Sequence, residues 1–376
     1  MSNHRLRGAA VPACLVLFLV GWMDGGATSL AQDGKTGYAV VSAQGATEAE
    51  AYAAKELAEF LGKMTGATFP VVPENDATTT SRRIFVGWTD FAARHQIDAA
   101  QLGDEEWVIR TVDSDLVIVG GRPRGTLYGV VAFLERELGC HWLDHNTEVV
   151  PKVAELRLGN LDRRGKPAFW FRSIYTTFLA DPSQQAAFAA RNMANSPSPG
   201  GLTAQHGFEE RCGSPGGCHT FAAYAQNFPA DRPEYLSMNT QGKRIGAKDG
   251  SGPGGICLMH PEVRKLVLAN LRAYIVKDRE NAAKSNRPPP RVYDISQNDN
   301  HWMCQCPECN AMSQREGSES GPVVDFINAI ADGIRPEYPD VYVMTFAYSI
   351  TEQPPKTLQV RDNVIIRIAE LNAEWG

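Results

Sequence analysis

The chain lacks any concentration of positive charge. Its 37 Lys and Arg residues are outnumbered by 43 Asp and Glu residues, which gives a net charge of -6. A nucleic-acid-binding surface needs clustered basic side chains to neutralise phosphates, so we expect no nucleic-acid partner. Hydrophobic residues make up 43% of the chain and charged residues 21%. This globular balance excludes a disordered chain, a collagen-like repeat and a coiled coil.

Long apolar runs are lacking as well. One apolar run, residues 9–22, is too short to span a bilayer comfortably. It follows two arginines and precedes the small residues Ser29 and Ala31, an order that is typical of a signal peptide. We therefore predict a signal peptide over residues 1–31 and a secreted or periplasmic protein that has no membrane contact after cleavage.

The glycine spacing of a dinucleotide-binding motif is also absent. In the segment VIVGGRPRGTLYG, glycines follow a predicted strand and precede a predicted helix. The spacing does not fit G-x-G-x-x-G, and Pro123 with two arginines lies where small residues would have to approach a pyrophosphate. We interpret the segment as a glycine turn that packs a helix against a sheet.

Residues 36–160 have the pattern of a small α/β domain. A capping box at Thr47 precedes an apolar stripe with helical spacing that ends at Gly66. A second predicted helix follows Gly125 and ends at Gly139. Short strands are expected at residues 38–41, 69–72 and 84–86, and a hairpin at residues 107–111 and 116–119.

Residues 165–376 alternate between strand-like and helix-like segments. They follow a polar segment, residues 160–167, that ends in proline and is expected to be a linker. The alternation argues for a parallel α/β arrangement. A (β/α) TIM-type barrel fits best, and an open doubly wound sheet is the alternative. Helices are expected at residues 184–195, 261–276 and 320–334, and strands at residues 169–175, 202–206, 292–296, 341–346 and 364–369.

This second region is short for a barrel. A complete barrel has eight strands and typically about 250 residues, whereas the region offers about five strand candidates. We therefore expect an α/β chain whose barrel is truncated after about five strands. Such a chain would expose an apolar edge and would be poorly soluble on its own.

Candidate site residues follow the predicted strands, because barrel chemistry takes place at the carboxyl ends of the strands. Glycoside hydrolysis needs an acid at the leaving oxygen. It also needs a second group at the oxocarbenium-like centre, either a carboxylate or the acetamido group of the substrate. We predict Asp299 and Glu370 as catalytic carboxylates. The predicted substrate-binding residues are Asn298, His206, His219 and Tyr348.

Each of these residues also has a purely structural interpretation. Asp299 lies in the segment QNDN, where Asn and Asp commonly cap loops through their own backbone. Glu370 could be a solvated edge residue, and His219 could lie on a surface turn. The sequence provides no distance between Asp299 and Glu370, so it does not distinguish a retaining from an inverting enzyme.

The segment HWMCQCPECN groups soft metal ligands in the pattern H-x2-C-x-C-x2-C. His301, Cys304, Cys306 and Cys309 would suit tetrahedral zinc. Export favours the other interpretation, a disulfide. In either case we expect the cluster to brace the loop that carries Asp299, and we expect hydrolysis to require no cofactor. The candidate disulfides join Cys304 or Cys306 to Cys309, Cys212, Cys218 or Cys257.

Two resemblances to known families accompany these patterns. The segment RGTLYGVVAFLERELGCHW resembles the accessory α/β domain that precedes the barrel in bacterial α-glucuronidases and family-20 β-N-acetylhexosaminidases. The resemblance covers residues 36–160 and implies a scaffold without functional residues.

The second resemblance covers about residue 165 to the last residue. It is carried by the segments DISQNDNHWMCQCPECN, EYPDVYVMTFAYSITEQPPKT and NVIIRIAE. These segments resemble the bacterial family called domain of unknown function 4838, which overlaps glycoside hydrolase family 163. That family's characterised activity is endo-β-N-acetylglucosaminidase action on complex N-glycans. The positions that match the family are Asn298, Asp299, Cys304, Cys306, Cys309 and Tyr348.

One position departs from the family pattern. Relatives often have an acidic-x-acidic step where this chain has Glu370, Leu371 and Asn372. If the second carboxylate is the catalytic acid, Glu374 has to replace it or the chain is impaired. We therefore expect an exported glycoside hydrolase that acts on complex glycans by β-N-acetylglucosaminidase-type cleavage. The alternatives are an α-glucuronidase-like hydrolase and a non-catalytic glycan-binding protein or inactive remnant.

Overall fold

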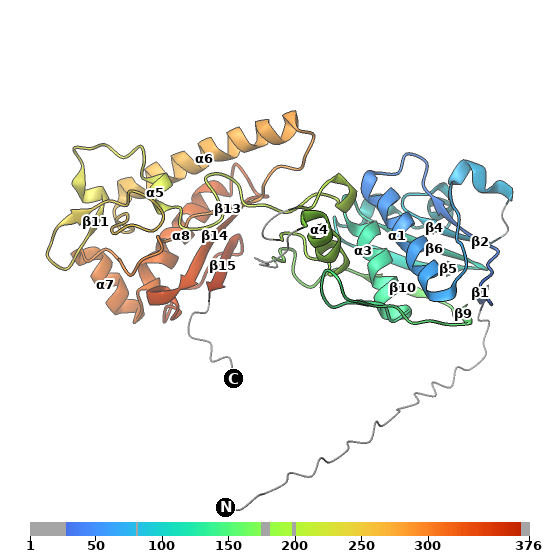
Figure 1. Ribbon diagram of the computed structural model, residues 1–376. Helices are drawn as coiled ribbons and strands as arrows, with labels where there is room; N and C mark the ends of the chain where they lie inside the picture. The colour runs from blue at the N-terminus through green and yellow to red at the C-terminus, as the bar shows by residue number, and fades with distance from the viewer. Residues whose placement is uncertain (1–27, 80–81, 174–180, 198–200, 370–376) are drawn as a thin grey trace, which may run out of the picture.

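The computed structural model describes residues 28–79, 82–173, 181–197 and 201–369 (Figure 1). Residues 1–27, which make up most of the predicted signal peptide, lie outside the described residues. The predicted catalytic residue Glu370 lies outside them as well. Among the helices of the described part, none has the length and apolar character that a membrane span requires.

The N-terminal region is built on a mixed six-stranded sheet with the order β10-β5-β6-β4-β2-β3. The neighbours β3, β2, β4 and β6 are parallel, and β5 pairs antiparallel with both β6 and β10. The expected hairpin is therefore confirmed. The strands are β2 (Tyr38–Ser42), β3 (Val71–Pro73), β4 (Arg82–Val86), β5 (Trp107–Val112), β6 (Asp115–Gly120) and β10 (Asp162–Gly165).

Two helices cover one face of this sheet. Helix α1 (Glu48–Thr65) begins with the predicted capping box at Thr47 and ends at Gly66, whose φ of 73° is the left-handed conformation that glycine tolerates. Helix α3 (Gly125–Ala132) continues into a π-helical turn, Phe133–Glu137. The apolar stripe of α1 is fully buried against the sheet and α3. The short helix α2 (Asp90–Arg94) packs on the opposite face.

The first described strand, β1 (Thr28–Gln32), pairs antiparallel with β9 (Glu155–Leu158). Its residues Leu30 and Ala31 are 1% and 3% exposed and belong to the N-terminal core. The predicted cleavage position after Ala31 therefore falls inside a paired strand.

The segment expected to be a linker, residues 160–167, instead contains β10 and completes the sheet. The polar composition is that of an edge strand, where side chains stay in solvent while the backbone pairs with β5. The same core extends further along the chain. Helix α4 (Pro182–Arg191) packs on it, and Leu202 belongs to it as well.

The C-terminal region contains a three-stranded parallel sheet with the order β13-β14-β15. These strands are Val292–Asp294, Tyr342–Tyr348 and Val364–Ala369, close to three of the predicted strands. Helices α6 (Pro261–Lys284) and α8 (Ser320–Ile334) cover one face, and α7 (Pro307–Glu316) packs against α8. The shorter elements are β7 (His141–Trp142), β8 (Glu148–Val149), α5 (Phe221–Tyr224), β11 (Ser237–Met238) and β12 (Arg244–Ile245).

The structure confirms an α/β fold, but the described residues form no closed barrel. A parallel bridge between Cys212 and Val292 places one more segment beside β13, so four segments lie in chain order across an open sheet. The other two expected strands are wrong in the described part. Residues 169–173 have no strand, and Phe169 is 75% exposed. Residues 204–206 form a 3-10 helix because the His206 ring folds back to accept a hydrogen bond from the Thr203 amide.

A buried ion-pair network, which we call the Arg124 network, joins the two regions. The Arg124 side chain is 2% exposed, and its guanidinium lies 2.9 Å from both Glu105 and Glu210. It also donates to the carbonyl oxygens of Gly207 and Phe208. The Arg291 guanidinium, next to β13, pairs with Glu210 at 2.5 Å. Charges are thus paired where β13 meets the N-terminal region.

Candidate functional site

The carboxyl ends of β13, β14 and β15 lie at one edge of the parallel sheet, because the three strands run in the same direction (Figure 1). The segment that leaves β13 is fixed against β14 along this edge. The Ile295 amide donates to the Met344 carbonyl oxygen, and the Gln297 side-chain amide donates to the Tyr348 carbonyl oxygen. The Thr351 hydroxyl donates to Gln297 Oε1 at 2.6 Å.

Asp299 and Tyr348 meet at this edge. The Tyr348 hydroxyl donates a hydrogen bond to Asp299 Oδ1 at 2.6 Å. This bond raises the pKa of Tyr348, so the phenol stays protonated and remains a donor at neutral pH. The backbone amide of Asp299 donates to the Gly250 carbonyl oxygen, which anchors the loop from the other side. The Asp299 side chain is exposed and Tyr348 is half-buried, so both can reach a ligand.

His219 lies beside this pair. Its backbone has a positive φ of 54° and is held by the Ser296 hydroxyl, which accepts from the His219 amide. Nδ1 of the ring lies 2.9 Å from the Gln297 carbonyl oxygen. A carbonyl oxygen only accepts, so Nδ1 carries a proton and a neutral ring leaves Nε2 as an acceptor. The ring centroid lies 5.2 Å from Phe346 and 5.9 Å from Tyr348.

Arg367 adds a positive charge next to these rings. Its guanidinium lies over the Phe346 ring at 5.4 Å and donates to the Gly217 carbonyl oxygen. A cavity of about 570 Å³ adjoins it, which is within the size range of small-molecule sites. Arg367 and Ile368 of β15 line this cavity together with Gly217, whereas Asp299 and Tyr348 do not.

The other predicted site residues lie differently. Asn298 is 2% exposed, and its side-chain amide points to the Gly254 carbonyl oxygen at 3.4 Å. The structure therefore buries it beneath the loop. His206 is not brought to this edge, because its ring packs edge-on against Tyr52 of α1. Burial lowers the pKa of His206 to about 4. Glu370 follows β15 and lies outside the described residues.

The predicted set of soft ligands needs a correction. The His301 ring lies away from the cysteines, with Nδ1 2.8 Å from the Ser349 hydroxyl. Cys257 takes the fourth position instead. The Sγ atoms of Cys257, Cys304, Cys306 and Cys309 all lie within 4.8 Å of one another. Every cysteine of the described part has a free thiol, so none of the disulfides considered above is formed there.

Sequence reasoning missed Asp294, which lies beneath the edge. The side chain is fully buried and accepts hydrogen bonds from Ser296 and Thr220 at 2.5 and 3.1 Å. Burial raises its pKa to about 6, although the two hydroxyls and the nearby Arg367 and His219 side chains act in the opposite direction. The signal available in the sequence was a carboxylate within an apolar strand.

We predict that Asp294→Asn changes the pH dependence of stability. The folded-state pKa lies above the unfolded value near 3.9, so ionisation destabilises the folded state as pH rises from about 4 through 6. Between pH 4.5 and 7.5 the wild type should lose about 2 kcal/mol relative to the variant. Urea unfolding at both pH values measures this. A difference between the two proteins that is independent of pH would contradict it.

Several solved structures are similar to the chain at low sequence identity. The family GH115 4-O-methyl-α-glucuronidase BtGH115A is 15% identical, with a TM-score of 0.49 over 89% of this chain and 45% of its own. The Streptomyces plicatus N-acetyl-β-hexosaminidase is 14% identical, with a TM-score of 0.40 over 93% and 67%. The Flavobacterium johnsoniae chitobiase is 12% identical, with a TM-score of 0.45 over 91% and 52%. The chain thus spans between about half and two thirds of the length of these proteins.

Two protein families match parts of the chain, and no curated protein matches it. Residues 29–133 match the family described as Glycosyl hydrolase family 67 N-terminus. Residues 142–376 match the family described as Domain of unknown function (DUF4838). Both resemblances seen in the sequence are thereby confirmed. Because the second match covers more than half of the residues of the chain, the chain belongs to the DUF4838 family.

Proposed function

We propose that the chain is a glycoside hydrolase that acts on complex glycans by β-N-acetylglucosaminidase-type cleavage. The observation that carries this proposal is the hydrogen-bonded pair of Asp299 and Tyr348 at the carboxyl edge of the parallel sheet. Parallel α/β enzymes bind their substrates at this edge. The pair is accessible, and it is rigidly attached to two neighbouring strands.

The pair suits an acetamido group. Such a group presents an N–H donor, and the Asp299 carboxylate, whose Oδ1 accepts from Tyr348, still has Oδ2 as the matching acceptor. In substrate-assisted hydrolysis the acetamido oxygen forms a bond to the anomeric carbon while the glycosidic bond breaks. The positive charge that develops on the acetamido nitrogen would be stabilised by Asp299. Tyr348 would hold the Asp299 carboxylate in position through the hydrogen bond that it donates.

The leaving oxygen has to receive a proton in this reaction. Glu370, the residue that follows β15 in the sequence, is the proposed acid, because the chemistry of parallel α/β enzymes is carried by residues that follow the strands. His219 Nε2 would accept a hydrogen bond from a sugar hydroxyl. The rings of Phe346 and Tyr348, 5.7 Å apart, offer apolar contact to a sugar face.

Arg367 favours a second candidate, an α-glucuronidase-like activity. A guanidinium is the side chain that best matches a carboxylate, and a uronic acid carries one. Arg367 lies beside the aromatic rings of the site and lines the adjoining cavity. The exposed carboxylate of Asp299 works against this candidate, since it would repel a uronate.

A panel of glycans distinguishes these candidates. The full chain is incubated with glycans that carry N-acetylglucosamine and with glycans that carry glucuronic acid, and the products are identified by mass spectrometry. The proposal expects cleavage at an N-acetylglucosamine residue. Cleavage at glucuronic acid alone would favour the second candidate. Binding without any product would indicate a non-catalytic glycan-binding protein and would overturn the enzymatic proposal.

We also propose that the chain is exported, to the periplasm or outside the cell, with a signal peptide that ends earlier than Ala31. Leu30 and Ala31 are buried in β1, so cleavage after Ala31 would remove a strand that β9 needs. Gly25 and Ala27 form another small-x-small site. The mature protein is therefore expected to begin at Thr28. N-terminal sequencing of the exported protein measures this, and a mature chain that begins at Gln32 would contradict it.

A further inference from the structure

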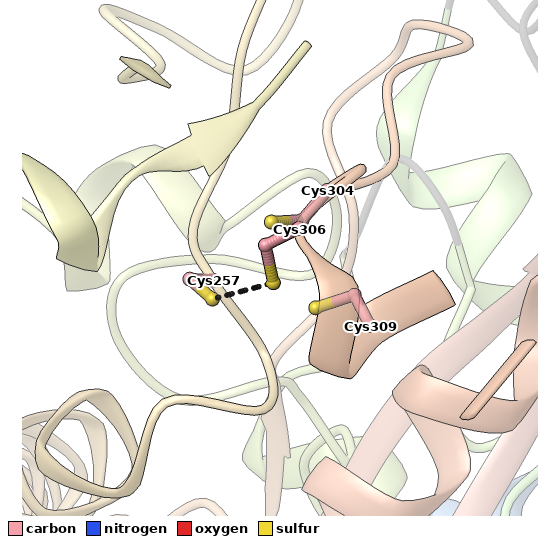
Figure 2. Close-up of side chains that lie close together, drawn as sticks. All are labelled: Cys257, Cys304, Cys306 and Cys309. Atoms are coloured by element: carbon pink, nitrogen blue, oxygen red, sulfur yellow. Dashed lines mark hydrogen bonds between the residues drawn. The ribbon is translucent and has the colours of Figure 1, made fainter. Parts of the chain in front are cut away.

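Four cysteine side chains, three from one short segment and one from a distant part of the sequence, converge beside the loop that carries Asp299. Cys257 comes from the segment between β12 and α6, Cys304 and Cys306 precede α7, and Cys309 lies in the first turn of α7. Figure 2 shows the four side chains directed toward a common centre. Each of the four residues is at most 3% exposed. We call this group the four-thiol cluster.

The spacing of the sulfur atoms fits a single tetrahedral metal ion. With zinc–sulfur bonds of about 2.3 Å, the sulfur atoms of a tetrahedral site lie about 3.8 Å apart. Cys257 Sγ and Cys306 Sγ are 3.7 Å apart, and all four Sγ atoms lie within 4.8 Å of one another. A disulfide would bring two sulfur atoms to about 2.05 Å and leave the other two as a separate pair. The cluster has the geometry of a common centre.

The surroundings of the cluster suit thiolate ligands. The Met238 amide donates to Cys304 Sγ at 3.3 Å, and the Arg244 guanidinium lies 3.7 Å from the same atom. Four thiolates around a divalent ion carry excess negative charge, which a backbone N–H and a cation offset. Met238 and Met259 pack against the cluster and keep it apolar. An apolar surrounding limits the access of water and competing ligands.

We propose that Cys257, Cys304, Cys306 and Cys309 bind one structural zinc ion. The thiols lose their protons to solvent on binding, so that four sulfur–zinc bonds form. All four positions around the metal are filled by the protein, which is the arrangement of a structural site, since a catalytic zinc keeps one position for water. This inference goes beyond the proposed function and does not depend on it.

The zinc ion would connect three segments of the C-terminal region. Cys304 follows Asp299 closely in the chain, and the Gln305 amide donates to the Met238 carbonyl oxygen of β11. Asn300 donates to the carbonyl oxygens of Gly252 and Gly254, which precede Cys257. The metal would therefore anchor the Asp299 loop to the 250–257 segment and to α7.

Metal analysis of the full chain, purified without chelators from zinc-supplemented cells, tests this site. We expect one zinc ion per chain, and we expect cobalt substitution to give the charge-transfer and ligand-field bands of a tetrahedral thiolate site. Cys257→Ser and Cys309→Ser should lose the metal. Cys140→Ser, in the N-terminal core, and Cys218→Ser, outside the cluster, are matched controls that should retain it.

A second measurement does not need the variants to fold. When the thiols of the wild type are titrated with a mercurial, the release of zinc should follow the reaction of the four cluster cysteines. After release, hydrogen exchange should increase at residues 299–309 and stay unchanged in β2. The melting temperature of the C-terminal region should fall by roughly 10 °C or more.

Three results would overturn the inference. One is a wild-type chain that contains no metal and has two disulfides instead. Its intact mass, measured without reductant, would be lower than that of the reduced chain by the hydrogen atoms that the two disulfides lose. Another is a Cys257→Ser variant that retains zinc together with a His301→Ala variant that loses it, because His301 would then be the fourth ligand. The third is release of the metal from the wild type without any change in hydrogen exchange near the cluster. Loss of glycan cleavage is not a readout here, so failure of the proposed function and failure of the zinc site are distinguishable.

Discussion

Asp299→Asn is expected to lower kcat on the cleaved glycan by about 10²–10³-fold while the fold stays intact. This is the usual loss when one group that stabilises transition-state charge is removed. The amide that replaces the carboxylate keeps its shape and can still accept from the Tyr348 hydroxyl, which now lies 2.6 Å from Asp299. It no longer stabilises a positive charge on the acetamido nitrogen. Because that charge develops only during the reaction, KM should change far less than kcat.

The same pair can be tested from its other side. Tyr348→Phe removes the phenolic donor and should also lower kcat. Because the two residues share one hydrogen bond, the fold-decrease in kcat of the Asp299→Asn, Tyr348→Phe double variant should be smaller than the product of the fold-decreases of the two single variants. Tyr342→Phe is the matched control, since it lies on the same strand at the amino end. Asp340→Asn is the control for the carboxylate, because Asp340 pairs with Arg279 on an exposed surface. Unchanged rates in Asp299→Asn would remove the pair from the mechanism.

Arg124→Met is expected to destabilise the protein by about 3 kcal/mol, the lower end of the range for breaking a buried ion pair. The variant leaves Glu105 and Glu210 with side chains that are only 12% and 10% exposed. The loss is moderated because Arg172 also pairs with Glu105 and Arg291 with Glu210. Thermal unfolding should show a decrease in Tm of roughly 6–12 °C.

A control and a compensating variant sharpen this prediction. Arg164→Met removes an arginine that is 61% exposed and paired with Glu106, so it should change stability by less than about 0.5 kcal/mol. Adding Glu210→Gln to Arg124→Met removes a buried charge that has lost one of its two arginine partners, and it should recover part of the loss. If Arg124→Met is as stable as Arg164→Met, the Arg124 network does not hold the two regions together.

The N-terminal region could be predicted from the sequence because its signals are local. The capping box at Thr47 and the left-handed glycine at Gly66 determine where α1 begins and ends. The prediction of a linker at residues 160–167 was wrong because an edge strand such as β10 can be polar on both faces. Its pairing with β5 is a long-range contact that no local pattern records.

The candidate site could be predicted where it depends on strand ends. Asp299 follows β13, and Tyr348 is the last residue of β14, its parallel neighbour. Because the carboxyl ends of parallel strands meet at the same edge of a sheet, the two residues could be expected to lie together. His206 was misplaced because the segment before it packs on α1 and is a 3-10 helix. Cys257 was considered only as a disulfide partner. It lies 49 residues from Cys306 in irregular chain, so spacing favoured the nearby His301 instead.

The loop between the candidate site and the four-thiol cluster is fixed at both ends. Tyr348 and Gly250 hold Asp299 at one end, and Met238 holds Cys304 at the other. Between them His301 and Trp302 are exposed. The length of this loop is therefore constrained more strictly than its composition. An engineer could exchange the exposed residues freely, whereas a single inserted residue would displace either the carboxylate or a thiol.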